Sequence, residues 1–187
     1  MSNVAHPWDN EPDADTFEAS ELVCVMRRDH NGVWNGYAGV PKSHALHGQR
    51  RDVLIIVPTS VAGRELNSTR VAAADLRGVV PRTLEADIAL PLSVVIDVHG
   101  GIWNTGVVGD NYPGLWFYGF MCGHQWDFKP LDPMTIQAYQ TDPEQAAQVF
   151  RTPAEYRTYD YARAETEMLA AQFAALADVV LAKQAMQ

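Results

Sequence analysis

The amino-acid sequence predicts an α+β fold, in which an antiparallel sheet of about five strands is followed by a long C-terminal helix. Short runs of β-branched and aromatic residues, which are typical of strands, recur between residues 21 and 121. Beyond residue 153 the chain is rich in Ala and has no Gly or Pro, which is typical of a helix. Strands first and helices last favour α+β over an alternating βαβ fold.

One domain is expected to hold most of the chain. The 187 residues fit a domain of ordinary size, and we expect it to span residues 19–187. Residues 1–18 are acidic and contain Pro7 and Pro12, so they predict a flexible N-terminal segment.

The first predicted strands form a hairpin. Residues 21–28 and 33–40 have strand-like composition, and the Asn31-Gly32 step between them suits a tight turn. Residues 53–57 (VLIIV) predict another short strand. The stretch that follows is ambiguous, with a short helix over residues 70–77 as one interpretation.

Two stronger strands are predicted further along the chain, over residues 92–98 and 115–121. The first is rich in Val and Ile and ends directly at His99, and the second is aromatic and ends directly at Cys122. Reactive side chains therefore follow the ends of predicted strands, where a rigid element can hold them at a site.

The C-terminal helix is predicted to run from residue 153 to about residue 183. Residues 141–144 and 152–155 both match the capping-box pattern that begins helices. A helix of about 30 residues is roughly 45 Å long, which exceeds what a small sheet covers. Its excess length is a candidate homo-oligomer contact. Apolar residues at helical spacing give it one apolar face: Leu169, Phe173, Leu176 and Val180.

Charge and composition narrow the class of function. The chain has 14 basic and 23 acidic residues, a formal charge of −9, whereas general nucleic-acid binding needs a net basic surface. Residues 1–18 do not resemble a signal peptide, and no apolar run approaches the ~20 residues of a membrane span. Two cysteines, Cys24 and Cys122, fit a reducing compartment. We therefore expect a soluble, cytoplasmic protein without membrane contact.

Three segments concentrate side chains that can carry chemistry: residues 41–48, 97–101 (DVHGG) and 122–127 (CGHQWD). A divalent metal such as zinc would take imidazole and carboxylate ligands. The adjacent glycines let the backbone approach a ligand closely. The candidate metal ligands are His44, His99, His124 and Asp127, and the candidate ligand-binding residues are His44, Gly100, Gly101, Trp103, Trp126 and Lys42.

Other chemistries stay open at this point. His99 and His124 are candidates for general acid–base catalysis, with Asp97 or Asp127 fixing a tautomer. Cys122 is a candidate nucleophile. Against these interpretations, histidines often cap turns, and free cysteines are usually buried. The charged residues along 155–167 are interpreted as a solvated helix face.

The same three segments resemble a family of uncharacterised bacteriophage and prophage proteins. In that family the patterns GYxGVPxxHPxxG, VHGG and GFDCxHxxD occur in this order. Here they match residues 36–48, 98–101 and 119–127, although Ala45 replaces a proline and Met121 replaces an aspartate. The resemblance marks residues 49–91 as an insertion and implies a phage protein in the host cytoplasm. The matched residues are His44, His99, Gly100, Gly101, Cys122, His124 and Asp127.

Together these observations predict a phage-type accessory protein that hydrolyses a small polar ligand, with a nucleotide as one candidate. The catalytic candidates are His99, His124, Asp127 and Cys122. Two alternatives stay open: a non-catalytic binder that sequesters a nucleotide-like host signal, and a structural or interaction module.

Overall fold

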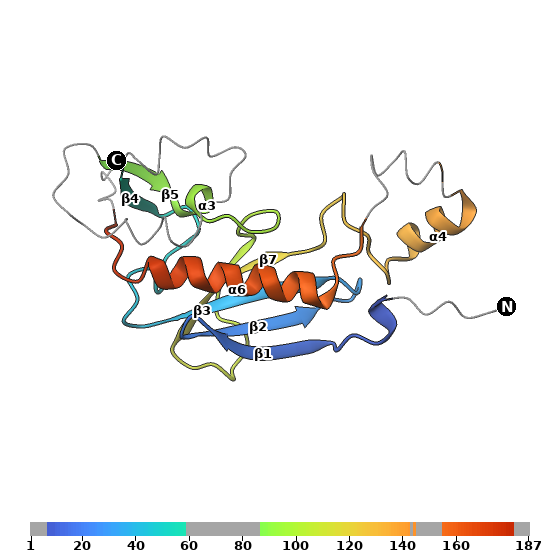
Figure 1. Cartoon of the computed structure of the whole chain (residues 1–187), viewed down its shortest axis with the longest axis horizontal. Helices are drawn as coiled ribbons and strands as arrows, with labels where there is room; N and C mark the ends of the chain where they lie inside the picture. Colours follow the sequence, from blue (N-terminus) through green and yellow to red (C-terminus); the bar gives the residue numbers. More distant parts are fainter. Residues whose placement is uncertain (1–6, 59–86, 143, 145–154, 182–187) are drawn as a thin grey trace.

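A computed structural model of the chain describes residues 7–58, 87–142, 144 and 155–181. Five antiparallel strands form the main sheet in the order β1-β2-β3-β7-β6, and β4 and β5 form a separate two-stranded sheet. The helix α6 lies across one face of the main sheet (Figure 1). The elements are η1 (Pro7–Asp9), β1 (Ala14–Ala19), β2 (Leu22–Arg28), β3 (Trp34–Pro41), β4 (Leu54–Pro58), β5 (Asp87–Pro91), α3 (Leu92–Val95), β6 (Asn104–Gly106), β7 (Leu115–Met121), α4 (Pro133–Thr141) and α6 (Tyr159–Ala175).

The predicted α+β fold, with a five-stranded antiparallel sheet and a C-terminal helix, is confirmed. The hairpin of β2 and β3 turns as expected, because Gly32 has a φ of 76° and donates its N–H to the Asp29 carbonyl at 3.0 Å. The predicted strand over residues 115–121 is β7, which pairs with β3. No helix in the described ranges is long and apolar enough to cross a membrane.

The core lies between α6 and the main sheet. Leu169, Phe173 and Leu176 are fully buried, and the Phe173 ring stacks on Tyr118 of β7 with centroids 4.4 Å apart. Thr166 packs closely against β3, where a Cβ on Gly36 would lie 2.2 Å from the Thr166 Oγ1. The apolar face of the helix therefore covers the sheet of its own chain.

The C-terminal helix is shorter than predicted, and the expectation of about 30 residues is wrong. The helix α6 has 17 residues and begins after Thr158, whose side chain accepts the Tyr161 N–H. After Ala175 the backbone turns and joins β4, with the Ile56 N–H donating to the Val180 carbonyl at 2.9 Å. The β-branched pair at 179–180 suits this extended pairing better than a helix. The 152–155 capping pattern lies mostly outside the described residues, as does the 70–77 segment.

The 92–98 segment was also predicted wrongly, because it is not a strand. It forms the short helix α3, with the Ile96 N–H donating to the Leu92 carbonyl at 3.0 Å. The extended stretch that follows bonds the Gln172 side chain of α6 through the backbone of Asp97. Leu92, Val95, Ile96 and Val98 are all buried. A short apolar run fits a helical turn as well as a strand, so periodicity does not separate the two.

Part of the segment that was expected to be flexible over residues 1–18 has regular structure, since η1 and β1 lie in its described portion. The strand β1 pairs with β2, and Glu11 accepts hydrogen bonds from the Trp34 Nε1–H at 3.0 Å and the Tyr159 N–H at 2.8 Å. Trp8 packs its ring against Phe128, with centroids 5.2 Å apart. These aromatic and acidic residues find partners far along the chain, which local composition does not reveal.

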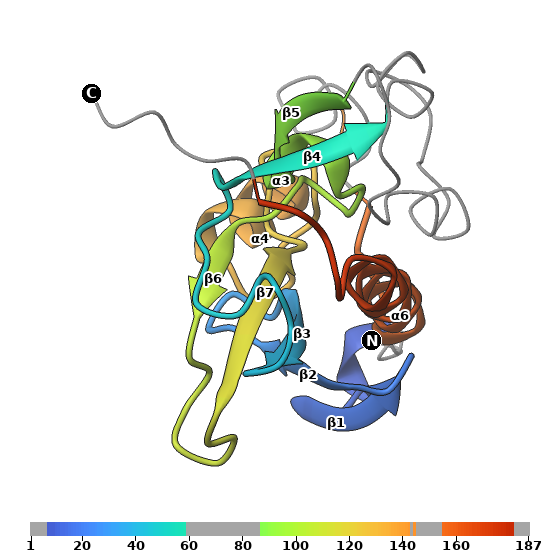
Figure 2. The same ribbon diagram turned by 90° about the vertical axis from the view of Figure 1, so that its left-hand side faces the viewer.

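The two described ends of the 49–91 segment pair with each other as β4 and β5. Figure 1 shows this small sheet above the C-terminal end of α6, and Figure 2 shows it apart from the main sheet. The N-terminal half of α6 meets the loop after α3 through Tyr161 and Glu165, and the candidate site lies there.

Candidate functional site

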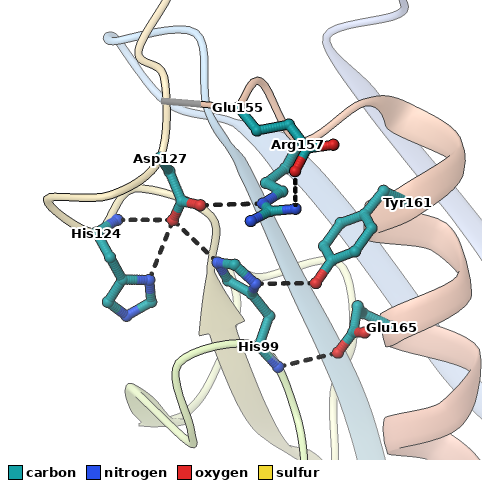
Figure 3. Close-up of polar contacts among 7 residues, drawn as sticks. All are labelled: His99, His124, Asp127, Glu155, Arg157, Tyr161 and Glu165. Atoms are coloured by element: carbon teal, nitrogen blue, oxygen red, sulfur yellow. Dashed lines mark hydrogen bonds and ion pairs between the residues drawn. The ribbon is translucent and has the colours of Figure 1, made fainter. Parts of the chain in front are cut away.

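Two chain segments bring His99, His124 and Asp127 together. His99 lies in the loop between α3 and β6, and the other two residues lie in the turn that follows β7 (Figure 3). Each residue offers one metal-ligating atom, and these atoms all lie within 4.8 Å of one another. The cluster is largely buried, since the side chains are 7%, 19% and 0% exposed, respectively. It can therefore form a site at the edge of the core.

Asp127 is the centre of this cluster. Its Oδ2 accepts from His99 Nε2 at 2.9 Å and from the His124 backbone N–H at 3.0 Å, and it lies 3.3 Å from His124 Nδ1. Its Oδ1 accepts from Arg157 Nε at 3.1 Å. Burial alone would raise the pKa of Asp127, but the hydrogen bonds and charge of its partners hold it below its ordinary value. The carboxylate is therefore ionised at neutral pH.

The helix α6 fixes His99. Tyr161 places its hydroxyl 3.0 Å from His99 Nδ1, and Glu165, one turn further along, accepts the His99 backbone N–H at 2.9 Å. Both side chains point toward the loop in Figure 3. Both ring nitrogens of His99 therefore have a side-chain partner, so the orientation of the ring is determined.

The His124 ring is held between an aromatic ring and a glycine. Trp126 stacks on it with centroids 4.7 Å apart and an interplanar angle of 4°. On Gly100, an added Cβ would lie 1.9 Å from the His124 Cε1. Gly100 and Gly101 also have φ values of 66° and 82°, which favour glycine. The VHGG turn thus leaves room for the histidine of the other motif.

Arg157 completes the site. Its Nη1 donates to Glu155 at 2.8 Å, and its guanidinium lies over the Tyr161 ring, 5.0 Å from the centroid. The guanidinium bonds Asp127, in the turn after β7, and Glu155, in the chain before α6. A backbone hydrogen bond joins the same two parts of the chain, since the Phe128 N–H donates to the Glu155 carbonyl at 3.1 Å. The turn after β7 is thereby tied to the chain that leads into α6.

Other candidate residues lie outside this cluster or in different surroundings. His44 is buried, its Nδ1 accepts the Leu46 N–H at 3.1 Å, and its Nε2 lies 2.8 Å from the Phe173 carbonyl. Burial lowers the pKa of His44, so the ring is neutral and serves as a hydrogen-bonding link in the core. Lys42 and Trp103 are exposed and are not members of the metal-ligating group.

Cys122 is buried directly after β7, and its backbone N–H donates to the Trp34 carbonyl at 2.8 Å. Burial raises the pKa of its thiol, and the carboxylates of Asp127 and Glu165 raise it further. At neutral pH Cys122 is therefore a protonated thiol, which is a poor nucleophile.

Sequence reasoning missed Arg157 and Glu165, which it assigned to a solvated helix face, and it gave Tyr161 no role in the site. Glu165 is in fact only 3% exposed. The signal that was available is the i, i+4 spacing of Tyr161 and Glu165, which places a hydroxyl and a carboxylate on one face of α6. Nothing local indicates that this face meets His99.

The cluster suits a divalent metal. Two imidazoles and one carboxylate are a ligand set that zinc and similar ions use. Ligands at about 2.0–2.1 Å from a tetrahedral ion lie roughly 3.3 Å apart, so small ring rotations would bring atoms within 4.8 Å into place. Tyr161 and Arg157 occupy the outer positions that commonly orient metal-binding histidines and carboxylates.

Comparisons with protein-family models, with curated proteins and with solved structures found no match.

Proposed function

We propose that this protein is a divalent-metal-dependent hydrolase of a small polar substrate, with His99, His124 and Asp127 as the metal ligands. The convergence of these three side chains carries the proposal. Three protein ligands leave one position of a tetrahedral ion open for water or substrate, as in catalytic zinc sites. A bound ion of this kind lowers the pKa of a water molecule and polarises the bond to be broken.

The contacts of His99 support this role. With its Nε2 directed at the metal position, the ring would carry its proton on Nδ1 and donate it to the Tyr161 hydroxyl, which lies 3.0 Å away. A tyrosine hydroxyl both donates and accepts, so it serves either histidine tautomer. Asp127 keeps the Arg157 hydrogen bond on Oδ1, which leaves Oδ2 for the ion. The outer contacts can thus remain when the ion binds.

The resemblance of the three motif segments extends the proposal to a phage or prophage context, in which the protein acts in the host cytoplasm as an accessory hydrolase. The substrate would approach from the side of His124, which is the most exposed of the three ligands. Trp126, which is 43% exposed beside it, offers an aromatic surface to that substrate.

Isothermal titration calorimetry of the metal-free protein with zinc is the direct test. We expect one equivalent of zinc to bind. Loss of a residue that only hydrogen-bonds a metal ligand lowers metal affinity by roughly 10–100-fold, and His124→Ala, which removes a ligand itself, should lower zinc affinity by more than this. His47→Ala is the matched control, because His47 bonds the Gly114 carbonyl and is not part of the cluster. Absence of saturable zinc binding by the wild-type protein would refute the proposal.

Product analysis separates a hydrolase from a binder. The zinc-loaded protein is incubated with panels of phosphate esters and nucleotides, and the small molecules are then identified by mass spectrometry. A hydrolase releases changed products, and His99→Ala abolishes the change. A sequestering protein returns the ligand intact after denaturation, which would support the binding alternative instead.

A further inference from the structure

We infer that the substrate carries an anionic phosphate-ester group and that Arg157 binds this group beside the metal position. The inference rests on the proposed function, because the ion at His99, His124 and Asp127 supplies the second positive charge. It names the substrate class and adds a residue that touches the substrate.

Two N–H groups anchor the guanidinium of Arg157, one to each of two carboxylates. Its Nε bonds Asp127 and one Nη1 proton bonds Glu155, at 3.1 and 2.8 Å. A guanidinium has five N–H donors, so these bonds leave its Nη2 group and one Nη1 proton without a hydrogen bond in the part of the chain that the structure describes. The side chain is 21% exposed, so part of it faces solvent.

The position of the guanidinium suits a ligand bound at the cluster. It lies over the Tyr161 ring and beside Asp127, and Figure 3 shows it on the same side of the cluster as His99. The ring and the carboxylate fix its plane before any ligand arrives. A pre-oriented guanidinium loses less side-chain entropy on binding and offers the planar fork that matches phosphate oxygens.

The cations of the site also suit an anion. The carboxylates of Asp127, Glu155 and Glu165 and the guanidinium of Arg157 have formal charges that sum to −2. A divalent ion would bring this sum to zero and would place a second cation beside Arg157. An ion and an arginine that face the same group are the clamp that enzymes use on phosphoryl oxygens. A neutral ester or amide would gain little from the second cation.

The reaction that this arrangement serves is phosphate-ester hydrolysis. The oxygen of water forms a new P–O bond, the ester P–O bond breaks, and the leaving alcohol takes up one proton of the water. Arg157 would hold a non-bridging phosphate oxygen while charge builds on it. Glu155, which is 72% exposed, then competes with the substrate for the same guanidinium.

Two substitutions test this with inorganic phosphate as the probe, titrated into zinc-loaded protein by calorimetry. We expect Arg157→Gln to weaken phosphate binding by about 10–100-fold, the loss that a charge-assisted hydrogen bond implies. We expect Glu155→Gln to strengthen it by about two- to fivefold, because the variant removes an exposed competitor for Arg157. Zinc affinity is measured on each protein in the same series.

Glu155→Gln decides the question even if Arg157→Gln fails to fold or to bind zinc. A role limited to orienting Asp127 predicts that Glu155→Gln leaves phosphate affinity unchanged, and that result would overturn the inference. If the wild-type protein binds no zinc, the proposed function fails first. If zinc binds equally to all three proteins and phosphate binds equally too, the metal site stands and the assignment of Arg157 fails.

Discussion

Replacement of Gly100 by Ala is expected to abolish metal binding while the fold survives. Gly100 has a φ of 66°, and a Cβ at this position would lie 1.9 Å from Cε1 and 2.1 Å from Nε2 of His124. Carbon atoms pack at about 3.5–4.0 Å, so the imidazole must move by roughly 1.5–2 Å. That movement breaks the stack with Trp126 and removes a ligand atom from the cluster.

The cost in stability can be separated into two parts. A left-handed backbone conformation costs a residue with a Cβ about 1–2 kcal/mol. Loss of the parallel stack between His124 and Trp126, with centroids 4.7 Å apart, adds about 0.5–1.5 kcal/mol. Because His124 is partly exposed, its ring can rotate outward, and the core is not disturbed. We therefore expect Gly100→Ala to lower the free energy of unfolding by about 1.5–3.5 kcal/mol.

The matched control is Gly101→Ala. Gly101 has a φ of 82°, but an added Cβ there would meet no atom within 4 Å. This variant should lose only the backbone part, about 1–2 kcal/mol, and should keep wild-type zinc affinity. Urea unfolding and zinc calorimetry on the two variants measure both quantities. Equal zinc affinity in Gly100→Ala and Gly101→Ala would refute the reasoning, because the steric contact with His124 would then have no consequence.

Three further predictions concern single side chains. His44→Gln should flatten the pH dependence of the free energy of unfolding. Burial lowers the pKa of His44 in the folded protein below its ordinary value of 6.5, so below that pH the unfolded chain binds more protons than the folded one. The wild-type protein therefore loses stability as the pH falls from 6.5 toward the folded pKa. Equal losses for both proteins in urea unfolding between neutral pH and about pH 5 would contradict this. Native Cys122 should resist iodoacetamide at neutral pH, because burial raises the pKa of its thiol and shields it; rapid labelling seen by mass spectrometry would argue otherwise. Tyr161→Phe should lower zinc affinity by roughly 10–100-fold, because it removes the hydrogen bond on His99 Nδ1. Unchanged affinity in calorimetry would exclude that role.

The elements that sequence predicted correctly are those with a local cause. The strands β2, β3 and β7 are runs of β-branched and aromatic residues, and the turn before β3 needs a glycine at a φ of 76°. The elements predicted wrongly depend on distant partners. The strand β1 exists because β2 offers it an edge and because Arg163 of α6 lies over the Phe17 ring, 4.1 Å from its centroid. Neither β2 nor Arg163 is indicated by the residues of β1 themselves, so this strand could not be predicted from its local sequence.

The same distinction applies to the candidate site. His99, His124 and Asp127 were predicted because their motifs place reactive side chains beside glycines at turns. Arg157 was not, because an arginine before a helix is usually solvated. Its role depends on Asp127, whose side chain is fully buried and accepts its Nε–H at 3.1 Å. A buried carboxylate needs a cationic partner. The sequence does not show that Asp127 is buried, so it gives no reason to expect a cation beside it.

The two kinds of histidine in this protein show what separates a site from a core. His44 and His99 are both buried or nearly so, and both use their two ring nitrogens. Among the described residues, the partners of the His44 ring are backbone groups, the Leu46 N–H and the Phe173 carbonyl, so another ligand could reach the ring only by breaking the core. The partners of the His99 ring there are side chains, Tyr161 and Asp127, which can rotate and exchange protons. Exchange of a hydrogen bond for a metal bond is therefore possible at His99 without disturbing the backbone, which supports the proposed metal site at the cluster and a structural role for His44.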